Sequence, residues 1–132
     1  DIVTAGSHDQ EAQPGELHDK GPRHLVEADL EGDAWPFRER TFDGIVVTNY
    51  LHRPLLPRLT EALAPRGALI YETFAVGQEA HGRPSNPSYL LREGELLDVF
   101  DGPLEVLAYE HVHETDPRPA VRQRICAMKP GR

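Results

Sequence analysis

Short apolar runs alternate with polar segments along most of this chain, and turn residues separate them. The runs at residues 25–28, 44–49 and 68–74 have the length of strands. Residues 44–49 are apolar and β-branched without alternation, which is typical of a parallel strand covered on both faces. The pattern therefore predicts three strands of a mainly parallel sheet.

Helical spacing occurs in two places between and after these runs. Apolar residues recur every three or four positions in 54–64, and the two prolines there are tolerated only in a first helical turn. Pro65 and Gly67 end this helix. A second, shorter helix is predicted over 93–100, whose apolar residues share one face.

The last two apolar segments, 104–112 and 120–128, alternate between apolar and polar positions. They predict an antiparallel pair joined by a turn near Asp116 and Pro117. With the preceding elements, the order becomes βαβαββ, which indicates an α/β domain.

Two stretches lack periodicity. Residues 77–87 form a long polar loop, of the length that often serves as a lid over a binding site. Residues 1–23 are rich in Gly, Pro and polar side chains, so we expect a flexible or loop segment there. The single domain is then expected to span 24–129.

Composition narrows the function classes. The chain of 132 residues carries 22 acidic and 14 basic side chains, a formal charge of -8. That charge repels phosphate backbones and anionic lipid, so neither nucleic acid nor a membrane is an expected partner. Cys126 is the only cysteine, no apolar run approaches the roughly 20 residues of a membrane span, and no signal pattern opens the chain. We expect a cytoplasmic protein, and a start at Asp1 indicates a cut or processed N-terminus.

Several motifs follow the order found in the later two-thirds of class I S-adenosylmethionine-dependent methyltransferases. Residues 42–49 (FDGIVVTN) resemble the fourth strand of that family. Residues 63–70 (LAPRGALI) resemble the turn into the fifth strand, with Arg66 in the place of the first Gly. The closing strand pair is similar to the family's antiparallel hairpin.

A closer likeness is to a bacterial subgroup near the tellurite-resistance-type methyltransferases. It rests on four short motifs in matching order, at residues 48–54 (TNYLHRP), 71–74 (YETF), 83–87 (RPSNP) and 90–97 (LLREGELL). The resemblance implies a partial Rossmann-like sheet, mostly parallel and ending in an antiparallel hairpin, with the first strands missing. It also implies S-adenosylmethionine as cofactor and methyl transfer to an unidentified small-molecule acceptor.

One feature of that family is absent from the sequence. No Gly-x-Gly-x-x-Gly pattern occurs, although such a turn lets backbone N–H groups approach a ligand closely. We therefore expect this form of the enzyme to be incomplete or inactive.

Candidate site residues follow from the rule that ligands bind beyond the carboxyl ends of parallel strands. The resemblance implies cofactor contacts at this edge, and Asp1 is interpreted as the remnant of a ribose-binding acid; the set is Asp1, Asp29, Leu30, Asn49 and Tyr50. The candidates for a base, an anion clamp or another catalytic role are His52, Arg53 and Glu72. The candidates for acceptor or lid contacts are Tyr71, Arg83, Asn86 and Tyr89. Strand-ending or turn-forming roles are equally compatible with these residue types.

Other interpretations remain open. A non-catalytic domain is one, because missing strands would leave an open edge beside 44–49 that invites a homodimer or a partner, unless 25–28 moves in beside it. A dinucleotide-binding oxidoreductase fragment is another, but its strands would stay parallel to the end of the sheet. His111 and His113 share one strand face, yet such histidines are usually solvated, so we predict no metal site.

Overall fold

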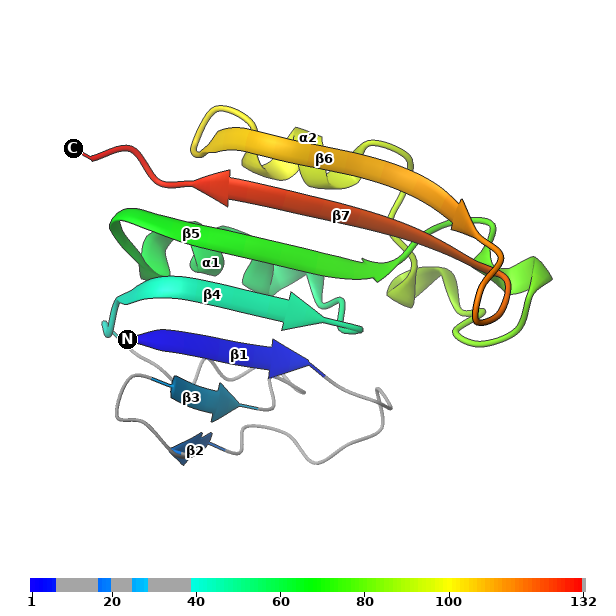
Figure 1. The fold of residues 1–132 in the computed structure, drawn as a ribbon, viewed down its shortest axis with the longest axis horizontal. Coiled ribbons are helices and arrows are strands. Elements are labelled where there is room, and N and C mark those ends of the chain that lie inside the picture. The colour runs from blue at the N-terminus through cyan, green and yellow to red at the C-terminus, as the bar shows by residue number, and fades with distance from the viewer. Residues whose placement is uncertain (7–16, 20–24, 29–38, 132) are drawn as a thin grey trace.

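The computed structural model describes residues 1–6, 17–19, 25–28 and 39–131. These residues form one sheet of seven strands in the order β2-β3-β1-β4-β5-β7-β6 (Figure 1). The strands are β1 (Ile2–Gly6), β2 (Leu17–Asp19), β3 (Leu25–Ala28), β4 (Phe42–Thr48), β5 (Leu63–Phe74), β6 (Glu105–Glu114) and β7 (Ala120–Met128). The helical elements are α1 (Leu56–Ala62), α2 (Glu95–Phe100) and the 3-10 turns η1 (Arg53–Leu55), η2 (Gln78–Ala80) and η3 (Pro87–Tyr89).

The inner strands β3, β1, β4 and β5 are parallel, whereas β7 runs antiparallel to both β5 and β6. This arrangement confirms the predicted α/β sheet with a closing antiparallel hairpin. It does not agree with an oxidoreductase fragment, whose strands were expected to stay parallel to the end.

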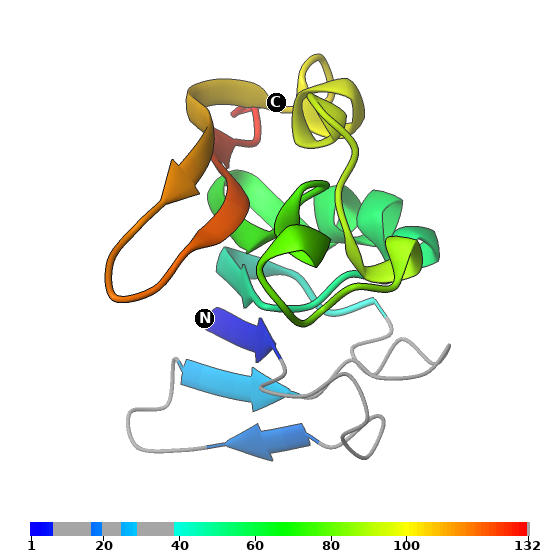
Figure 2. The ribbon, with the colours of Figure 1, turned by 90° about the vertical axis from the view of Figure 1, so that its right-hand side faces the viewer.

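The helices α1 and α2 cover one face of this sheet (Figure 2). The side chains beneath them are the inward-facing positions of the strands, with Val3, Ile45, Leu69 and Ile125 at most 2% exposed. Burying each such side chain contributes about 1.5–3 kcal/mol, so this face holds the main core. No helix of the described residues covers the other face, where Ile70 is 48% exposed. Among the residues that the structure describes, no helix is long and apolar enough to cross a membrane.

The N-terminal segment differs from its prediction as a loop. Ile2–Gly6 forms an inner strand, paired with β3 on one side and β4 on the other, and Leu17–Asp19 pairs with β3. Five residues are too few to display a clear period, and the burial of Val3 and Ala5 comes from the neighbouring strands. The expected open edge on β4 is therefore wrong, because β1 occupies it. The 25–28 strand pairs with β1 and not with β4.

The junction between α1 and β5 also differs from expectation. The helix ends at Ala62 and β5 begins at Leu63, five positions before the predicted start. Pro65 lacks an N–H and restricts the residue before it to extended backbone, which stops the helix early. Lys129 Nζ then donates to the carbonyl oxygens of Thr60, in the last turn of the helix, at 3.1 Å and of Leu63, at the start of β5, at 2.8 Å, so a cation interacts favourably with the carboxyl end of the helix.

Candidate functional site

The carboxyl ends of β1, β4 and β5 meet at one edge of the sheet. Gly6 pairs with Thr48, Thr48 pairs with Glu72, and Glu72 pairs with Arg124 of the antiparallel β7. Residues paired across neighbouring strands point to the same face, so these four form a row at the edge of the face without described helices. This edge is where open α/β sheets bind ligands.

The first pair in this row is in very close contact. A Cβ atom on Gly6 would lie 2.3 Å from the carbonyl oxygen of Thr48 and 2.8 Å from its Oγ1. The position that a Cβ atom of residue 6 would take is thus filled by Thr48, so this strand pairing requires glycine. The polar groups available to a ligand lie farther along, after β4.

Asn49, the first residue after β4, is held in position by two contacts. Its φ of 54° is in the left-handed region, which Asn tolerates better than most side chains. Its backbone N–H donates to the Glu72 carbonyl at 2.9 Å, and its Oδ1 accepts from Arg122 Nη1 at 2.9 Å. The Arg122 guanidinium lies 4.2 Å above the Phe74 ring and forms an ion pair with Glu114 at 3.2 Å. The predicted site residue Asn49 is therefore fixed at the edge.

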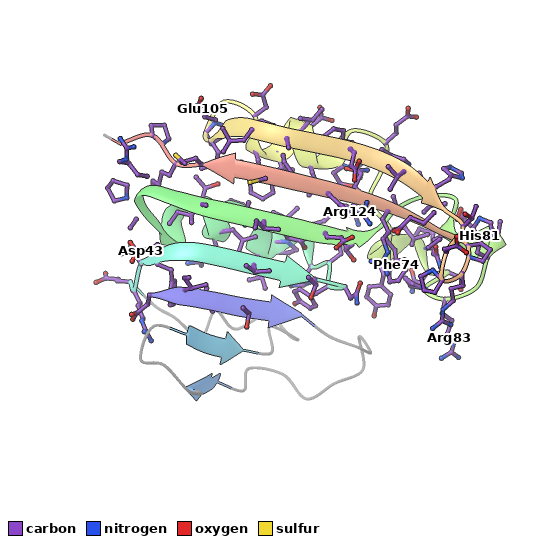
Figure 3. The ribbon with its side chains drawn as sticks, in the orientation of Figure 1. Asp43, Phe74, His81, Arg83, Glu105 and Arg124 are labelled. Carbon is purple, nitrogen blue, oxygen red and sulfur yellow. The ribbon has the colours of Figure 1, made fainter. Side chains whose placement is uncertain are left out.

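Glu72 belongs to an ion cluster centred on Arg124 of β7. Figure 3 labels Arg124. Arg124 donates from Nε to Glu72 at 2.5 Å, from Nη1 to Glu110 at 2.8 Å and from Nη2 to Glu114 at 2.8 Å. Burial by itself lowers the pKa of Arg124, but the bonds to Glu110 and Glu72 outweigh it and raise that pKa above its usual value. Glu72 thus lies where the prediction placed it, with one oxygen already bound to an arginine.

Tyr71 and Tyr50 lie on the other side of the sheet from Glu72. Tyr71 is 1% exposed and donates from its hydroxyl to the Tyr50 carbonyl at 2.6 Å. Burial raises the pKa of Tyr71 far above its usual value, so the phenol stays neutral. Tyr50 is 2% exposed. The expectation that Tyr71 contacts an acceptor is wrong, because its inward phase on β5 places it in the core. Tyr50 can offer a ligand only its backbone.

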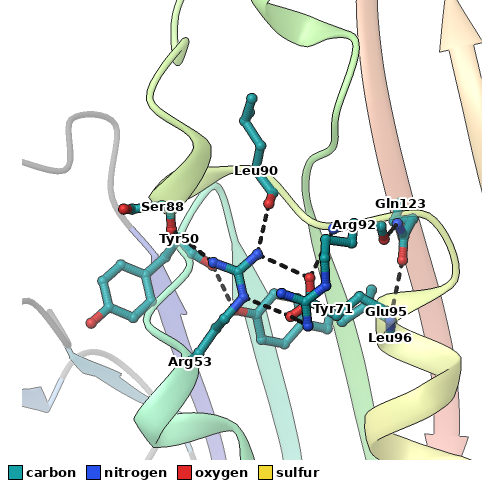
Figure 4. A network of polar contacts seen from close by, with 9 residues as sticks. All are labelled: Tyr50, Arg53, Tyr71, Ser88, Leu90, Arg92, Glu95, Leu96 and Gln123. Carbon is teal, nitrogen blue, oxygen red and sulfur yellow. Dashed lines mark hydrogen bonds and ion pairs between the residues drawn. The ribbon is translucent and has the colours of Figure 1, made fainter.

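Arg53 forms hydrogen bonds to the segment that follows β5 (Figure 4). It donates from Nε and Nη2 to the two carboxylate oxygens of Glu95 at 2.7 and 2.9 Å. It also donates to the carbonyls of Leu90 at 2.7 Å and Ser88 at 3.3 Å. Each of its three nitrogens is therefore engaged, and the predicted role of Arg53 as an anion clamp is replaced by a structural one. His52, half-buried, precedes it at the N-cap of η1.

The acceptor of these bonds, Glu95, is 3% exposed. Burial alone raises its pKa, yet the hydrogen bonds from the Arg53 guanidinium and the Arg92 backbone N–H outweigh that effect. The pKa of Glu95 therefore lies below its usual value, and the side chain stays charged inside the fold.

Two buried glutamines attach the same loop to β7. Gln78 accepts from the Val121 N–H at 2.9 Å and donates to the Arg83 carbonyl at 3.0 Å. Gln123 donates to the Arg92 carbonyl at 2.6 Å and accepts from the Leu96 N–H at 3.2 Å. Sequence reasoning missed both. Gln123 carried a signal, since it occupies an inward position between the apolar Val121 and Ile125.

The predicted lid residues lie in this loop, which returns to the end of β5 where the Leu91 N–H donates to the Phe74 carbonyl at 3.0 Å. Arg83 is exposed at the tip and extends away from β4 (Figure 3). The Asn86 side chain accepts from the Ser88 N–H at 2.9 Å and so caps η3. Tyr89 is half-buried at the end of that turn.

The remaining predicted residues lie elsewhere. Asp1 precedes β1 at the amino end of the sheet, where Arg40 Nη2 binds its carboxylate at 2.5 Å and its α-amino group contacts Asp43 at 2.8 Å. It is therefore at the opposite edge from Asn49, and its predicted ribose contact is not supported. Asp29 and Leu30 lie outside the described residues.

The polar groups at this edge are of the kind that hydrogen-bond to part of S-adenosylmethionine. Asn49 and Glu72 offer a neutral amide and a carboxylate at the ends of neighbouring parallel strands. The glycine-rich turn is absent from the sequence, and Gly6, at the end of β1, allows the close approach of Thr48. The described residues thus resemble one wall of a cofactor site.

Comparison with known proteins supports the fold. No protein-family model and no curated protein matches the chain. Among solved structures, the N-methyltransferase NodS from Bradyrhizobium japonicum superposes with a TM-score of 0.52 at 15% identity, over 69% of this chain and 52% of NodS. TehB from Haemophilus influenzae gives 0.54 at 18% identity, over 78% of this chain and 41% of TehB.

A SAM-dependent methyltransferase from Methanosarcina mazei gives a TM-score of 0.57 at 16% identity, over 98% of this chain and 82% of its own. The chain thus spans about half the length of NodS and less of TehB. These matches confirm the predicted resemblance at the level of the fold, which is that of S-adenosylmethionine-dependent methyltransferases, the tellurite-resistance type included.

Proposed function

We propose that the protein to which this chain belongs transfers a methyl group from S-adenosylmethionine to a small-molecule acceptor at the carboxyl edge of β4 and β5. The observation that carries the proposal is the position of Asn49 and Glu72 at that edge, in a sheet with the fold of methyltransferases. The acidic balance of the chain favours a small acceptor over nucleic acid.

The bound cofactor supplies a methyl group on a sulfonium sulfur, which keeps the electron pair of the breaking C–S bond while an acceptor lone pair forms the new bond. The protein must hold the acceptor in line and exclude water. Asn49 is the residue best placed to bind a ligand, because both its backbone and its side chain are fixed. Glu72 is the carboxylate best placed to take up the acceptor's proton, through the oxygen that does not bind Arg124.

We also propose that these 132 residues alone bind the cofactor weakly. The sequence offers no glycine-rich turn whose N–H groups would hold the methionine portion. Binding then relies on the wall formed by the ends of β4 and β5.

Isothermal titration with S-adenosylhomocysteine tests the proposal, using the chain and the product of its complete reading frame side by side. We expect binding by the complete product and weaker binding by the chain. A Glu72→Gln variant should keep binding but lose methyl transfer, whereas Glu93→Gln on the exposed surface should change neither. The absence of binding by both proteins would rule out the enzyme and favour a non-catalytic domain.

A further inference from the structure

We propose that Arg122 is a positioning residue that turns the Asn49 amide so that its Nδ2 group faces the ligand. The inference rests on the proposed function for the location of that ligand. It makes the end of β4 a subsite for a hydrogen-bond acceptor on the ligand.

The orientation of the amide follows from the chemistry of its partner. Arg122 Nη1 and Asn49 Oδ1 are 2.9 Å apart. A guanidinium carries only donors, so the amide atom that faces it must be the oxygen. The Nδ2 group then points elsewhere with two N–H donors, and within the described ranges the structure records no protein acceptor for it.

Both partners are held independently of each other. The Arg122 guanidinium lies over the Phe74 ring at 4.2 Å and pairs with Glu114 at 3.2 Å. The Asn49 backbone is fixed by its φ of 54° and by its hydrogen bond to the Glu72 carbonyl. Because neither group needs the other to stay in place, the contact between them sets the rotation of the amide.

The consequence concerns the ligand. A half-buried amide that offers only N–H groups binds a carboxylate oxygen, a carbonyl oxygen or a ring nitrogen, and disfavours an ammonium group. S-Adenosylhomocysteine contains both a carboxylate and ring nitrogens, whereas 5′-methylthioadenosine lacks the carboxylate. Comparing the two probes therefore shows whether Asn49 contacts the carboxylate or the adenosine portion of the ligand.

The sharpest variant is Asn49→Asp. Asp also tolerates left-handed backbone, and it keeps an oxygen for Arg122 while it removes the donor. We expect its affinity for S-adenosylhomocysteine to fall roughly fivefold to tenfold, the loss of one hydrogen bond. Its melting temperature should stay equal to that of the parent or rise, because the new carboxylate pairs with Arg122.

A cycle with Arg122→Leu separates positioning from a general structural role. In the Arg122→Leu background, Asn49→Asp should lower the melting temperature, since the carboxylate has lost its cation. Arg118→Leu, on the exposed hairpin turn, is the matched control and should leave the effect of Asn49→Asp as in the parent. The inference is supported if Asn49→Asp lowers the melting temperature in the Arg122→Leu background but not in the Arg118→Leu background. The same shift in both backgrounds contradicts it.

The outcomes are distinguishable from a failure of the proposed function. If neither the chain nor the product of the complete reading frame binds either probe, the proposed ligand is contradicted, and the subsite with it, while the melting cycle still decides whether Arg122 sets the amide. If both probes bind but Asn49→Asp binds them as tightly as the parent does, the subsite is wrong although the proposed ligand stands. A loss with S-adenosylhomocysteine alone assigns the carboxylate, and a loss with both probes assigns the adenosine portion; either supports the subsite.

Discussion

Arg53 and Glu95 form a two-point ion pair, with Nε donating to Oε2 at 2.7 Å and Nη2 to Oε1 at 2.9 Å. The pair joins the turn after β4 to the first turn of α2, 42 residues farther along the chain. Because Arg53 also binds the carbonyls of Ser88 and Leu90, the whole segment between β5 and α2 is attached to the end of β4. The pair therefore stabilises the edge of the sheet that is proposed to bind the ligand.

Glu95→Gln should lower the free energy of unfolding by about 1–3 kcal/mol, because the half-buried Arg53 guanidinium loses the buried carboxylate that is its counter-charge. Urea unfolding measures this loss, and limited proteolysis should show faster cleavage within residues 76–92. Glu93→Gln, two positions earlier and exposed, should stay within about 0.5 kcal/mol of the parent. Equal losses for the two variants would contradict the role of the pair.

The pH dependence of stability should also depend on Glu95. Its pKa in the folded state lies below the unfolded value of about 4.3, so its contribution is fully present above that pH. As the pH falls further, through the folded pKa, the contribution is lost. The difference in unfolding free energy between the parent and Glu95→Gln should therefore be constant at pH values well above about 4.3 and should shrink as the pH falls below that value. A difference that stays constant as the pH falls would show that the carboxylate is not preferentially ionised in the fold.

Gly6→Ala should separate the ends of β1 and β4. The new Cβ would lie 2.3 Å from the Thr48 carbonyl oxygen, a distance that real side chains do not adopt. We expect a loss of about 1–3 kcal/mol in urea unfolding. In Gly44→Ala, in the same strand pair, the new Cβ meets the Ile2 side chain at 3.3 Å and the Ala68 carbonyl oxygen at an ordinary 3.9 Å, so this variant should cost below about 1 kcal/mol. If both variants cost the same, the close approach does not limit this strand pairing.

Tyr71→Phe should destabilise the fold by about 1–2 kcal/mol, because the buried Tyr50 carbonyl loses its donor. Thermal unfolding measures the loss. Tyr89→Phe removes the hydroxyl of a half-buried side chain in η3, for which the described residues show no hydrogen bond, and should be close to neutral. A neutral Tyr71→Phe variant would mean that another donor replaces the phenol.

Arg66→Gly should be more stable than Arg66→Ala by roughly 1 kcal/mol. Arg66 has a φ of 66°, which costs an L side chain energy and costs glycine almost none. The comparison with Ala removes the contribution of the guanidinium itself. Differential scanning calorimetry decides between the two, and an Ala variant of equal or greater stability would show that this turn is not strained.

Local pattern alone determined much of this fold. The unbroken β-branched run at 44–49, the helical spacing that gave α1 and the alternation over 104–112 and 120–128 each depend on neighbours in the chain. Such periods survive in any protein that buries one face, so they can be recognised without coordinates. The order of motifs likewise identified the methyltransferase fold, and it placed Asn49 and Glu72 at the ends of their strands.

Tertiary structure decided what those positions do. Ile2–Gly6 forms an inner strand because β3 and β4 provide hydrogen-bond partners on both sides. A segment of five residues is too short for its sequence pattern to show that pairing. Arg53 has a structural role because the fold brings Glu95, 42 residues farther along the chain, within hydrogen-bonding distance of it. Asn49 acquired a defined amide orientation only because β7 brings Arg122 to it across 73 residues. The sequence by itself determined which side chains stand at the edge, and contacts between distant segments determined which of them remain available to a ligand.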